Sequence, residues 1–477
     1  MDNFTKTKIV ATIGPASSSY ETLKKMAEAG MNVARINFSH GSHDDHKQVI
    51  ENIRQLNRDT DARIGILADL QGPKIRTGVV EDEPMTLNDG DILTLTTKEV
   101  PCKDQTVYIK YNRFAADVKP GEQVLIDDGK IVLRILDTNS DDLVKAEVVS
   151  GGYLFSKKGV NLPNTKVSIP SLTEKDLKDL EFLLTEEVEW IGLSFVRSAA
   201  DIIELRHRIK KSGKRCRIIA KIEKPEALED IDDIIVNSDA VMVARGDLGV
   251  ELPMEEVPVI QKMIVKKCLQ LGRPTIIATQ MMESMITNFS PTRAEVNDAA
   301  NSILDGADAV MLSGETSTGK HPVRVVSAVK RIIEHIEAQD IYDFPISLFQ
   351  KEHPSRERYI SNQICLTACR VSNEMQATAL VANTHSGYSA IKLSSYRPKA
   401  NIYAFTGNDF ILNALSLVWG VRCISYDKFV STDHTIADIR YILRKQGFAR
   451  EGDYIVNIAS IPMEERGMSN MLKISVV

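Results

Sequence analysis

The chain has 477 residues, a formal net charge of −6 and 26% charged residues. This slight acidity predicts no general attraction to nucleic acid, and the lack of any apolar run of about 18 residues predicts no membrane partner. The six cysteines include no Cys-x-x-Cys pair, which favours buried reduced thiols in a cytoplasmic protein over a redox or metal site. A chain of this length can bury two or three separate cores.

Short apolar segments alternate with amphipathic helical segments from residue 8 to residue 314. The predicted strands are 8–14, 31–39, 63–70, 190–196, 217–223, 240–246, 275–280 and 309–314. Alternating strands and helices form a parallel sheet, and strands without strict polar alternation are buried on both faces. A doubly wound open sheet would give the same local pattern. Eight units favour a closed barrel whose active site lies at the carboxyl ends of its strands.

About a hundred residues separate the third strand from the helical segment that begins at Leu172, which is too many for an ordinary loop. Residues 86–97 and 124–136 each read as a strand pair, the first around an Asn-Asp-Gly turn and the second around an Asp-Gly turn. We therefore expect residues 71–167 to form a small β-barrel domain, inserted where it can act as a lid. The main barrel would comprise residues 1–70 and 168–344.

The remaining residues, 345–477, read as a separate unit. A polar stretch at 347–359, with Pro345 just before it and Pro354 within it, suits a linker. A helix, several short strands and a further helix follow, enough for a domain with its own core. The expected fold class is therefore α/β: a (β/α)8 TIM barrel with an inserted β lid domain and a C-terminal α/β regulatory domain.

Charged and polar side chains follow four consecutive barrel strands. They are Lys221 and Glu223, then Arg245 and Asp247, then Thr279, then Ser313 and Glu315. Glu223 and Asp247 should point into one mouth, where two oxygen ligands suit Mg²⁺ or Mn²⁺ better than zinc. The alternative is that these acids pair with Lys221 and Arg245. Gly246 favours a ligand site, because it allows close backbone approach and a helix starting there would hold a carboxylate.

Lys221 lies on the same side of its strand as Glu223. A lysine in a barrel mouth either neutralises phosphate charge or acts as a Schiff-base nucleophile, and the nearby acids favour phosphate. We expect Arg35, Arg76 and Lys157 to bring further positive charge to the mouth. Several cations with a divalent metal are the equipment of phosphoryl transfer.

Two other motifs have ordinary explanations. The histidine-rich segment 40–46 could bind a metal, but Ser42 and Asp45 have the spacing of a capping box that opens a helix. The methionines at 281, 282 and 285 are expected to fill the core.

Several segments, in order over almost the whole chain, resemble the signature segments of the pyruvate kinase family. They are NVARINFSHG, DLQGPKIRTG, KKGVNLP, KIEKPEAL, MVARGDLGVE, ATQMMESM, PTRAEVNDAAN and DGADAVMLSGETSTGKHP. The resemblance implies transfer of phosphate from phosphoenolpyruvate to ADP, giving pyruvate and ATP, by a cytoplasmic homotetramer.

The resemblance also implies roles for residues that handle phosphate and metal. Glu223 and Asp247 would hold the divalent ion that bridges the substrate phosphate and the enolate oxygen, and a second Mg²⁺ would arrive with ADP. Lys221 would stabilise the phosphoryl group during transfer. Arg35 and Arg76 would contact phosphates. The residues expected to lie toward the nucleotide are Asn37, His40 and Lys157.

Further roles implied by the resemblance concern the substrate carboxylate and the enolate. Gly246, Asp247 and Thr279 would receive the carboxylate. Thr279, with Ser313 and Glu315 behind it, would relay a proton to the enolate carbon. Because the pKa of a threonine hydroxyl is far too high for a donor at neutral pH, we expect water behind it to be the source.

The loop 384–389 follows a predicted strand and opens a predicted helix. The residues that could bind a phosphate there are Thr384, Ser386, Gly387 and Ser389. An ordinary capped turn would look the same. In the family that the chain resembles, this loop receives the phosphate of an effector, and members that use a bisphosphate place extra basic residues in a later loop. Here that loop, 460–470, offers only Arg466, so we expect a sugar monophosphate or an AMP-like effector.

One segment departs from the family pattern. Many members read Asp-Thr-Lys-Gly-Pro-Glu and require K⁺, which binds among the equivalents of Asn37, Ser39, Asp69 and Leu70. This chain reads Asp-Leu-Gln-Gly-Pro-Lys from Asp69 to Lys74. An ammonium about 5 Å from K⁺ would repel it by about 3 kcal/mol at an effective dielectric constant of about 20. Unless Lys74 points to solvent, it can replace the ion, and we expect K⁺ not to be required.

Two other functions fit part of the pattern. A metal-dependent aldolase acting on pyruvate enolate would share the barrel and the two carboxylates, but it would need neither the lid nor the phosphate-binding cations. A non-catalytic sensor should have lost one of Lys221, Glu223, Asp247 and Thr279, and all four are present. Formation of ATP from phosphoenolpyruvate and ADP distinguishes these possibilities.

Overall fold

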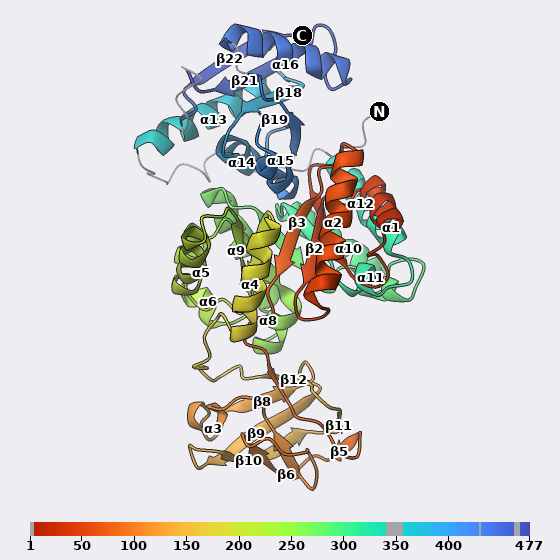
Figure 1. Ribbon diagram of the computed structural model, residues 1–477, viewed down its shortest axis with the longest axis vertical. Helices are drawn as coiled ribbons and strands as arrows, with labels where there is room; N and C mark the ends of the chain where they lie inside the picture. The colour runs from red at the N-terminus through yellow and green to blue at the C-terminus, as the bar shows by residue number, and fades with distance from the viewer. Residues whose placement is uncertain (1–3, 340–355, 429–430, 462–467) are drawn as a thin grey trace.

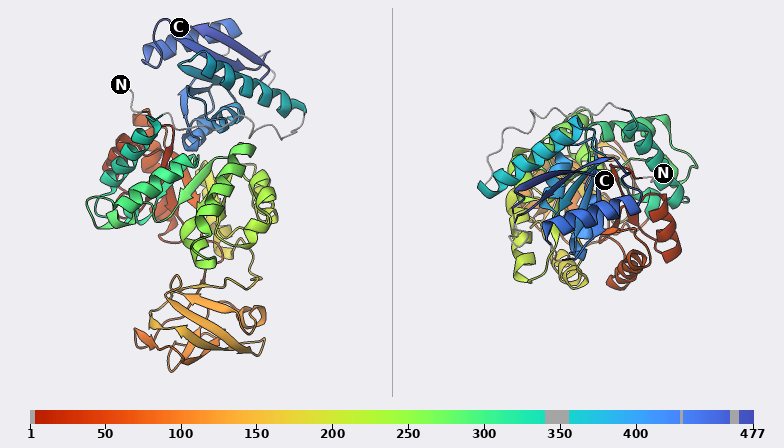
Figure 2. Two further views of the ribbon diagram at one scale, coloured as in Figure 1. Left: turned by 180° about the vertical axis from the view of Figure 1, so that it is seen from behind. Right: turned by 90° about the horizontal axis from the view of Figure 1, so that it is seen from above.

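The computed structural model describes residues 4–339, 356–428, 431–461 and 468–477. Three bodies follow one another along the long axis: the inserted β domain, the barrel and the C-terminal α/β domain (Figure 1). The view from behind shows the same stacking (Figure 2). Among the described residues, no helix is long and apolar enough to cross a membrane.

Eight parallel strands close into a barrel, which confirms the predicted fold class. Around the barrel they are β1 (Lys8–Ile13), β2 (Val33–Asn37), β3 (Gly65–Asp69), β13 (Trp190–Leu193), β14 (Arg217–Ile222), β15 (Ala240–Ala244), β16 (Thr275–Ala278) and β17 (Ala309–Leu312). Pairing of Lys8 with Ala309 closes the ring between β1 and β17. Nearly every strand position is buried, as expected for strands covered on both faces.

Helices surround the barrel. The longer ones are α1 (Tyr20–Ala29), α2 (His43–Asp59), α4 (Glu174–Glu186), α5 (Ala199–Lys211), α7 (Ile231–Asn237), α9 (Val257–Leu271), α10 (Arg293–Leu304) and α12 (Pro322–Glu337). Short helices follow the strand ends: α6 (Glu226–Glu229), α8 (Arg245–Glu251), η1 (Glu283–Ile286) and α11 (Gly314–Ser317). The capping box of Ser42 and Asp45 opens α2, which confirms the ordinary explanation of the histidine-rich segment. Met281, Met282 and Met285 are buried in the core, as expected.

The inserted domain is a sheet that closes on itself. Its elements are β4 (Ile75–Arg76), β5 (Met85–Leu87), β6 (Ile92–Thr96), β7 (Thr106–Tyr108), α3 (Phe114–Asp117), β8 (Gln123–Ile126), β9 (Ile131–Thr138), β10 (Leu143–Ser150), β11 (Gly152–Leu154) and β12 (Gly159–Asn161). The order β4-β12-β8-β9-β10-β6-β7 makes one seven-stranded sheet, and a bridge between Thr77 and Ile109 links its two edges. The hairpin predicted within 124–136 is present as β8 and β9.

The strand pair predicted within 86–97 is wrong. Strands β5 and β6 form there, but β5 pairs with β11, and β6 lies between β10 and β7. The loop between them is bound to the neighbouring strands instead: Gly90 N donates to Val148 O at 2.8 Å, and Gly151 N donates to Asp89 Oδ1 at 2.7 Å. Because these contacts hold the loop against other parts of the sheet, β5 and β6 do not pair with each other. The Asn-Asp-Gly turn was therefore not sufficient to predict a hairpin.

The C-terminal domain is a five-stranded sheet with helices on it. It comprises α13 (Arg356–Glu374), β18 (Ala379–Asn383), α14 (Tyr388–Ser395), β19 (Asn401–Thr406), α15 (Asp409–Ala414), η3 (Leu415–Leu417), β20 (Val421–Ser425), α16 (Thr432–Lys445), β21 (Tyr454–Ala459) and β22 (Met471–Val476). Most of the predicted linker lies outside the described residues, and its last residues, 356–359, belong to α13. Arg466 also lies outside them.

The two ends of the barrel have different neighbours. The C-terminal domain covers the amino ends of the strands: Trp190 Nε1 donates to Ala414 O at 3.1 Å, and Arg397 pairs with Asp308 at 3.0 Å. The inserted domain instead follows the carboxyl end of β3. The carboxyl ends, hereafter the mouth, are therefore the end at which a site can open, and the amino ends form a covered base.

Candidate active site

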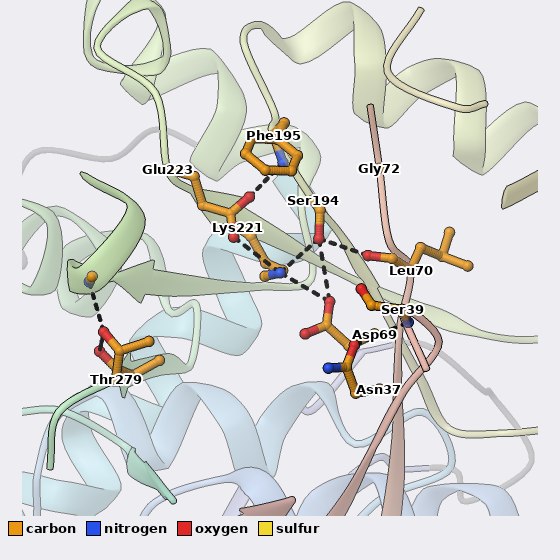
Figure 3. A network of polar contacts seen from close by, with 12 residues as sticks. Asn37, Ser39, Asp69, Leu70, Gly72, Ser194, Phe195, Lys221, Glu223 and Thr279 are labelled. Carbon is orange, nitrogen blue, oxygen red and sulfur yellow. Dashed lines mark hydrogen bonds and ion pairs between the residues drawn. The ribbon is translucent and has the colours of Figure 1, made fainter. Parts of the chain in front are cut away.

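Lys221, from β14, is the centre of a buried polar network at the mouth (Figure 3). Its ammonium lies 3.0 Å from Asp69 Oδ1 and 3.0 Å from Glu223 Oε1. It also donates to Ser194 Oγ at 2.6 Å. Strands β3, β13 and β14 are neighbours in the barrel, so three strand ends bring these groups together.

Asp69 joins this network to Arg35 of β2. Arg35 donates to Asp69 Oδ2 from Nε at 2.8 Å and from its terminal nitrogen at 2.6 Å. Burial alone would raise the pKa of Asp69, but the charges of Lys221 and Arg35 outweigh it and hold the pKa below its ordinary value. Asp69 is thus an anion between two cations. The sequence analysis assigned Asp69 only to the K⁺ motif and did not predict its contact with Lys221. The position of Asp69 at the end of a barrel strand was the signal that could have indicated this contact.

The surroundings of Lys221 disfavour one reaction. Burial lowers the pKa of the amine, but Asp69 and Glu223 raise it further, so the net shift is upward. A Schiff-base nucleophile must be a neutral amine, which this environment opposes. The role left for Lys221 is that of a fixed positive charge.

Glu223 and Asp247 provide oxygen donors suited to a divalent metal. Burial raises the pKa of Glu223, Lys221 lowers it in part, and Asp247 and Asp69 raise it further. A divalent cation would relieve this crowding of negative charge. Glu223 does pair with Lys221, as the alternative expected, but Arg245 pairs with Asp298 at 2.7 Å. Within the described ranges, no three His, Cys, Asp or Glu side chains form a metal-binding group, so substrate or water would have to complete the coordination.

Gly246 and Thr279 meet where α8 begins. The amide of Gly246 donates to Thr279 Oγ1 at 2.7 Å, and a Cβ at residue 246 would lie 3.2 Å from that oxygen. Thr279 has φ 71°, a left-handed conformation that is uncommon for threonine. Arg245 donates to the carbonyl of Thr279 at 2.8 Å and supports this conformation. The expected helix start is present, with Asp247 in its first turn.

Ser313 and Glu315 lie at the end of the next strand. One oxygen of Glu315 accepts from Ser313 N at 2.6 Å, and the other accepts from Met282 N at 3.0 Å. Thr279 Oγ1 donates to Ala278 O at 2.6 Å. Both carboxylate oxygens of Glu315 therefore accept hydrogen bonds from backbone amides, and the residue supports the two loops that carry Thr279 and Ser313.

The other residues expected at the mouth come from the inserted domain and from β2. Arg76 donates to Lys157 O at 3.1 Å, so these two lie together on the inserted domain. Lys74 is exposed and lines a groove with Phe195 and Asp247. At the end of β2, Asn37 Oδ1 accepts from Ser39 N at 3.1 Å, and His40 is exposed.

The candidate effector loop lies at the opposite end of the barrel. Gly387, with φ 80°, caps α14, and its amide donates to Thr384 Oγ1 at 3.0 Å. Ser389 is buried, and the carbonyl of Ser386 accepts from Arg217 at 2.8 Å. Since Arg217 begins β14, the strand that carries Lys221 also contacts this loop.

Comparisons with known proteins agree along the chain. A model described as pyruvate kinase, barrel domain, matches residues 4–326, and one described as pyruvate kinase, alpha/beta domain, matches residues 362–475. The pyruvate kinase of Geobacillus stearothermophilus is 41% identical, over 99% of this chain and 80% of the relative. That of Corynebacterium glutamicum is 41% identical, over 98% of this chain and 97% of the relative. A crystal structure of a pyruvate kinase from Cryptosporidium parvum superposes with a TM-score of 0.92 at 32% identity, covering 99% of this chain and 96% of that one.

Proposed function

This chain belongs to the pyruvate kinase family and transfers the phosphoryl group of phosphoenolpyruvate to ADP in the last step of glycolysis. We propose the following roles for the residues at the mouth. The observation that carries the proposal is the Lys221 ammonium, fixed 3.0 Å from each of two buried carboxylates. A charge held so firmly needs no reorganisation when the phosphoryl group moves past it, which is the basis of electrostatic catalysis. Lys221 therefore stabilises the transferring group, and Arg35 and Arg76 orient phosphates.

Substrate carboxylate binds where α8 begins. The donors there are the amides of Gly246 and Asp247 and the hydroxyl of Thr279, and the absent side chain of Gly246 leaves room for close approach. The Gly246 amide is bound to Thr279 Oγ1 and the Thr279 hydroxyl to Ala278 O, so the carboxylate would have to displace these bonds. Thr279 then faces the enolate that remains after transfer. Ser313 and Glu315 hold the loop geometry for proton delivery, with water as the proton source.

The family generally uses Mg²⁺, and the donors of this chain fit it. Glu223 and Asp247 would hold Mg²⁺ or Mn²⁺, which when bound neutralises charge on phosphate and enolate oxygens. A second Mg²⁺ accompanies ADP. Asn37, His40 and Lys157 lie toward the nucleotide.

K⁺ is not required in our proposal, because two of its four expected ligands already have partners. Asp69 is paired with Arg35 and Lys221, and the carbonyl of Leu70 accepts from Ser194 Oγ at 2.7 Å. Lys74 adds positive charge to the groove beside Asp247. Rates should match in potassium, sodium and a bulky organic cation at equal ionic strength. The double variant Leu70→Thr with Lys74→Glu should acquire a K⁺ requirement, and strong stimulation of the unmodified enzyme by K⁺ alone would refute the proposal.

Regulation is proposed at the loop of Thr384, Ser386, Gly387 and Ser389, through a sugar monophosphate or an AMP-like ligand. The loop offers three hydroxyls and a helix start, but Gly387 N is already bound to Thr384, so binding would have to displace that bond. Titration of each ligand against the phosphoenolpyruvate saturation curve tests this. Strong activation by fructose bisphosphate alone would contradict it.

A coupled assay for ATP from phosphoenolpyruvate, ADP and Mg²⁺ tests the reaction itself. An aldolase would cleave or condense pyruvate without forming ATP, and a sensor would bind substrate without turnover. We further propose a cytoplasmic homotetramer, which light scattering of the purified protein can test.

A further inference from the structure

Glu251, the last residue of α8, is a buried point of contact between three elements. Its side chain is 1% exposed. One carboxylate oxygen, Oε1, accepts from Lys224 Nζ at 2.6 Å and from Asn161 Nδ2 at 2.8 Å. The other oxygen, Oε2, is buried without a hydrogen-bond partner among the described residues. A buried carboxylate is costly unless it is paired, so its two donors matter for where α8 sits.

Each donor comes from a different functional element. Lys224 directly follows Glu223 after β14, and the opposite end of α8 carries Gly246 and Asp247. Asn161 ends β12 of the inserted domain. The Glu251 carboxylate therefore joins the metal-binding strand, the substrate-binding helix and the inserted domain.

The Asn161 bond is a direct link from the inserted sheet to the barrel. Gly72 and Val167, in the connecting segments, also bond to barrel residues. Between β4 and β12, Asp117 of α3 also accepts from Ser168 N at 2.9 Å, at the start of the second barrel segment. Asn161 differs in that it lies on a strand of the sheet and bonds α8. Strand β12 also pairs with β4, with Gly159 opposite Arg76. Asn161 is thus joined through a short strand pair to Arg76, which in turn bonds the carbonyl of Lys157.

We propose that Glu251 is a positioning residue that fixes the position of the inserted domain relative to α8. Through Asn161 it fixes where Arg76 and Lys157 stand relative to substrate held at Gly246 and Asp247. This rests on the proposed roles of those residues toward nucleotide and substrate. The Lys224 bond holds the Glu251 side chain in place, so the contact between Glu251 and the inserted domain can be removed without disturbing it.

The variant Asn161→Ala removes the hydrogen bond between Asn161 and Glu251 and leaves the ion pair of Lys224 and Glu251 intact. We expect the KM for ADP to rise about tenfold, because Arg76 and Lys157 lose the contact that fixes them relative to α8. The KM for phosphoenolpyruvate should stay within about twofold of its value in the unmodified enzyme. So should the rate of exchange of the pyruvate methyl protons, because that exchange needs no ADP. Asn164→Ala is the matched control, because Asn164 is exposed three residues further along the same segment. It should leave all three quantities unchanged.

Glu251→Gln provides the second variant. It removes the charge that Lys224 pairs with, and we expect the KM values for ADP and for phosphoenolpyruvate to rise together. An unchanged ADP KM in Asn161→Ala, or an equal loss of proton exchange in that variant, would overturn the inference. If the unmodified enzyme forms ATP while Asn161→Ala matches it in ADP KM, only the role of Glu251 fails. If the unmodified enzyme forms no ATP, the assigned reaction fails instead.

Discussion

The mouth and the base of the barrel both bury charged side chains, but they satisfy them differently. At the base, Glu189 accepts from Ile66 N at 2.8 Å and from Asn413 at 3.2 Å, and Lys8 donates to Val421 O at 3.0 Å. At the mouth, Lys221 is bound chiefly by the side chains of other mouth residues. Charges at the base are therefore fixed by the neighbouring domain, whereas charges at the mouth are available to a ligand.

The pKa shifts follow the same division. Burial raises the pKa of Glu189 to about 7 and lowers that of Lys8 to about 7, so each moves toward its neutral form. Lys221 is equally buried, yet its pKa is raised because two carboxylates stand beside it. At Glu189 and Lys8 burial outweighs the nearby opposite charges and favours the neutral form, whereas at Lys221 two adjoining carboxylates outweigh burial and preserve the charge that catalysis requires.

The largest effect should come from Lys221→Ala. Because the ammonium acts on charge that moves during phosphoryl transfer, kcat should fall about a thousandfold or more, with little change in phosphoenolpyruvate binding. Exchange of pyruvate methyl protons depends on the metal site and Thr279 and should survive better. Steady-state ATP formation and proton exchange measure the two activities, and an equal loss of both would refute this division of roles.

Arg397→Met tests the base. The guanidinium is 1% exposed and bonds Asp308 and the carbonyl of Gly306, so its loss leaves a buried carboxylate without its cation. We expect the free energy of unfolding to fall by about 3–5 kcal/mol, with kcat of the folded enzyme nearly unchanged. Arg444→Met is the control, because its pair with Glu451 is exposed and should cost at most about 1 kcal/mol. Equal losses in denaturant titrations would contradict the contrast.

The pH dependence of stability should reveal Glu189. Its ordinary pKa is 4.5 and its folded pKa about 7, so between these values the folded state holds a proton that the unfolded state has released. Stability should therefore fall by about 3 kcal/mol as pH rises from about 4.5 to about 7, and then level off. Glu189→Gln mimics the protonated form and should remove this component of the fall. Identical pH profiles of unfolding for the two proteins would show that the shift is absent.

The smallest effect should appear where the base meets the proposed effector loop. Arg217 begins β14 and bonds the carbonyl of Ser386, so it connects the loop to the strand of Lys221. Arg217→Ala should weaken activation by the effector about fivefold while leaving activity without effector unchanged. Arg215→Ala, two residues earlier and exposed, should behave like the unmodified enzyme. Full activation of Arg217→Ala would exclude this connection.

The barrel was predictable because its strands have simple signals. Each is a short apolar run with polar residues at its carboxyl end, as with Lys221 and Glu223, which share a face because they lie two residues apart. The insertion was predictable from loop length. In the C-terminal domain the sequence predicted the strands near residues 379–383, 401–406, 423–427 and 453–460 but not β22, an antiparallel edge strand whose residues are all partly or fully exposed, so that no buried apolar run marks it.

Contacts across the site were harder to predict than its residues. The pairing of Lys221 with Asp69 and that of Arg245 with Asp298 both join strands or helices far apart in the chain. The pairing of Arg245 with Asp247, which the sequence left open as an alternative to the metal site, did not form. Which partner a buried charge selects is decided by the register of the closed barrel, which a local pattern does not contain.

Two buried glutamates, one at each end of the barrel, provide the most direct test of the whole account. Glu223 at the mouth and Glu189 at the base can each be changed to glutamine, which keeps the size and removes the charge. We predict that kcat for ATP formation falls by at least about a hundredfold in Glu223→Gln and stays within about twofold in Glu189→Gln. Comparable values of kcat in the two variants would contradict the separation of chemistry at the mouth from stability at the base.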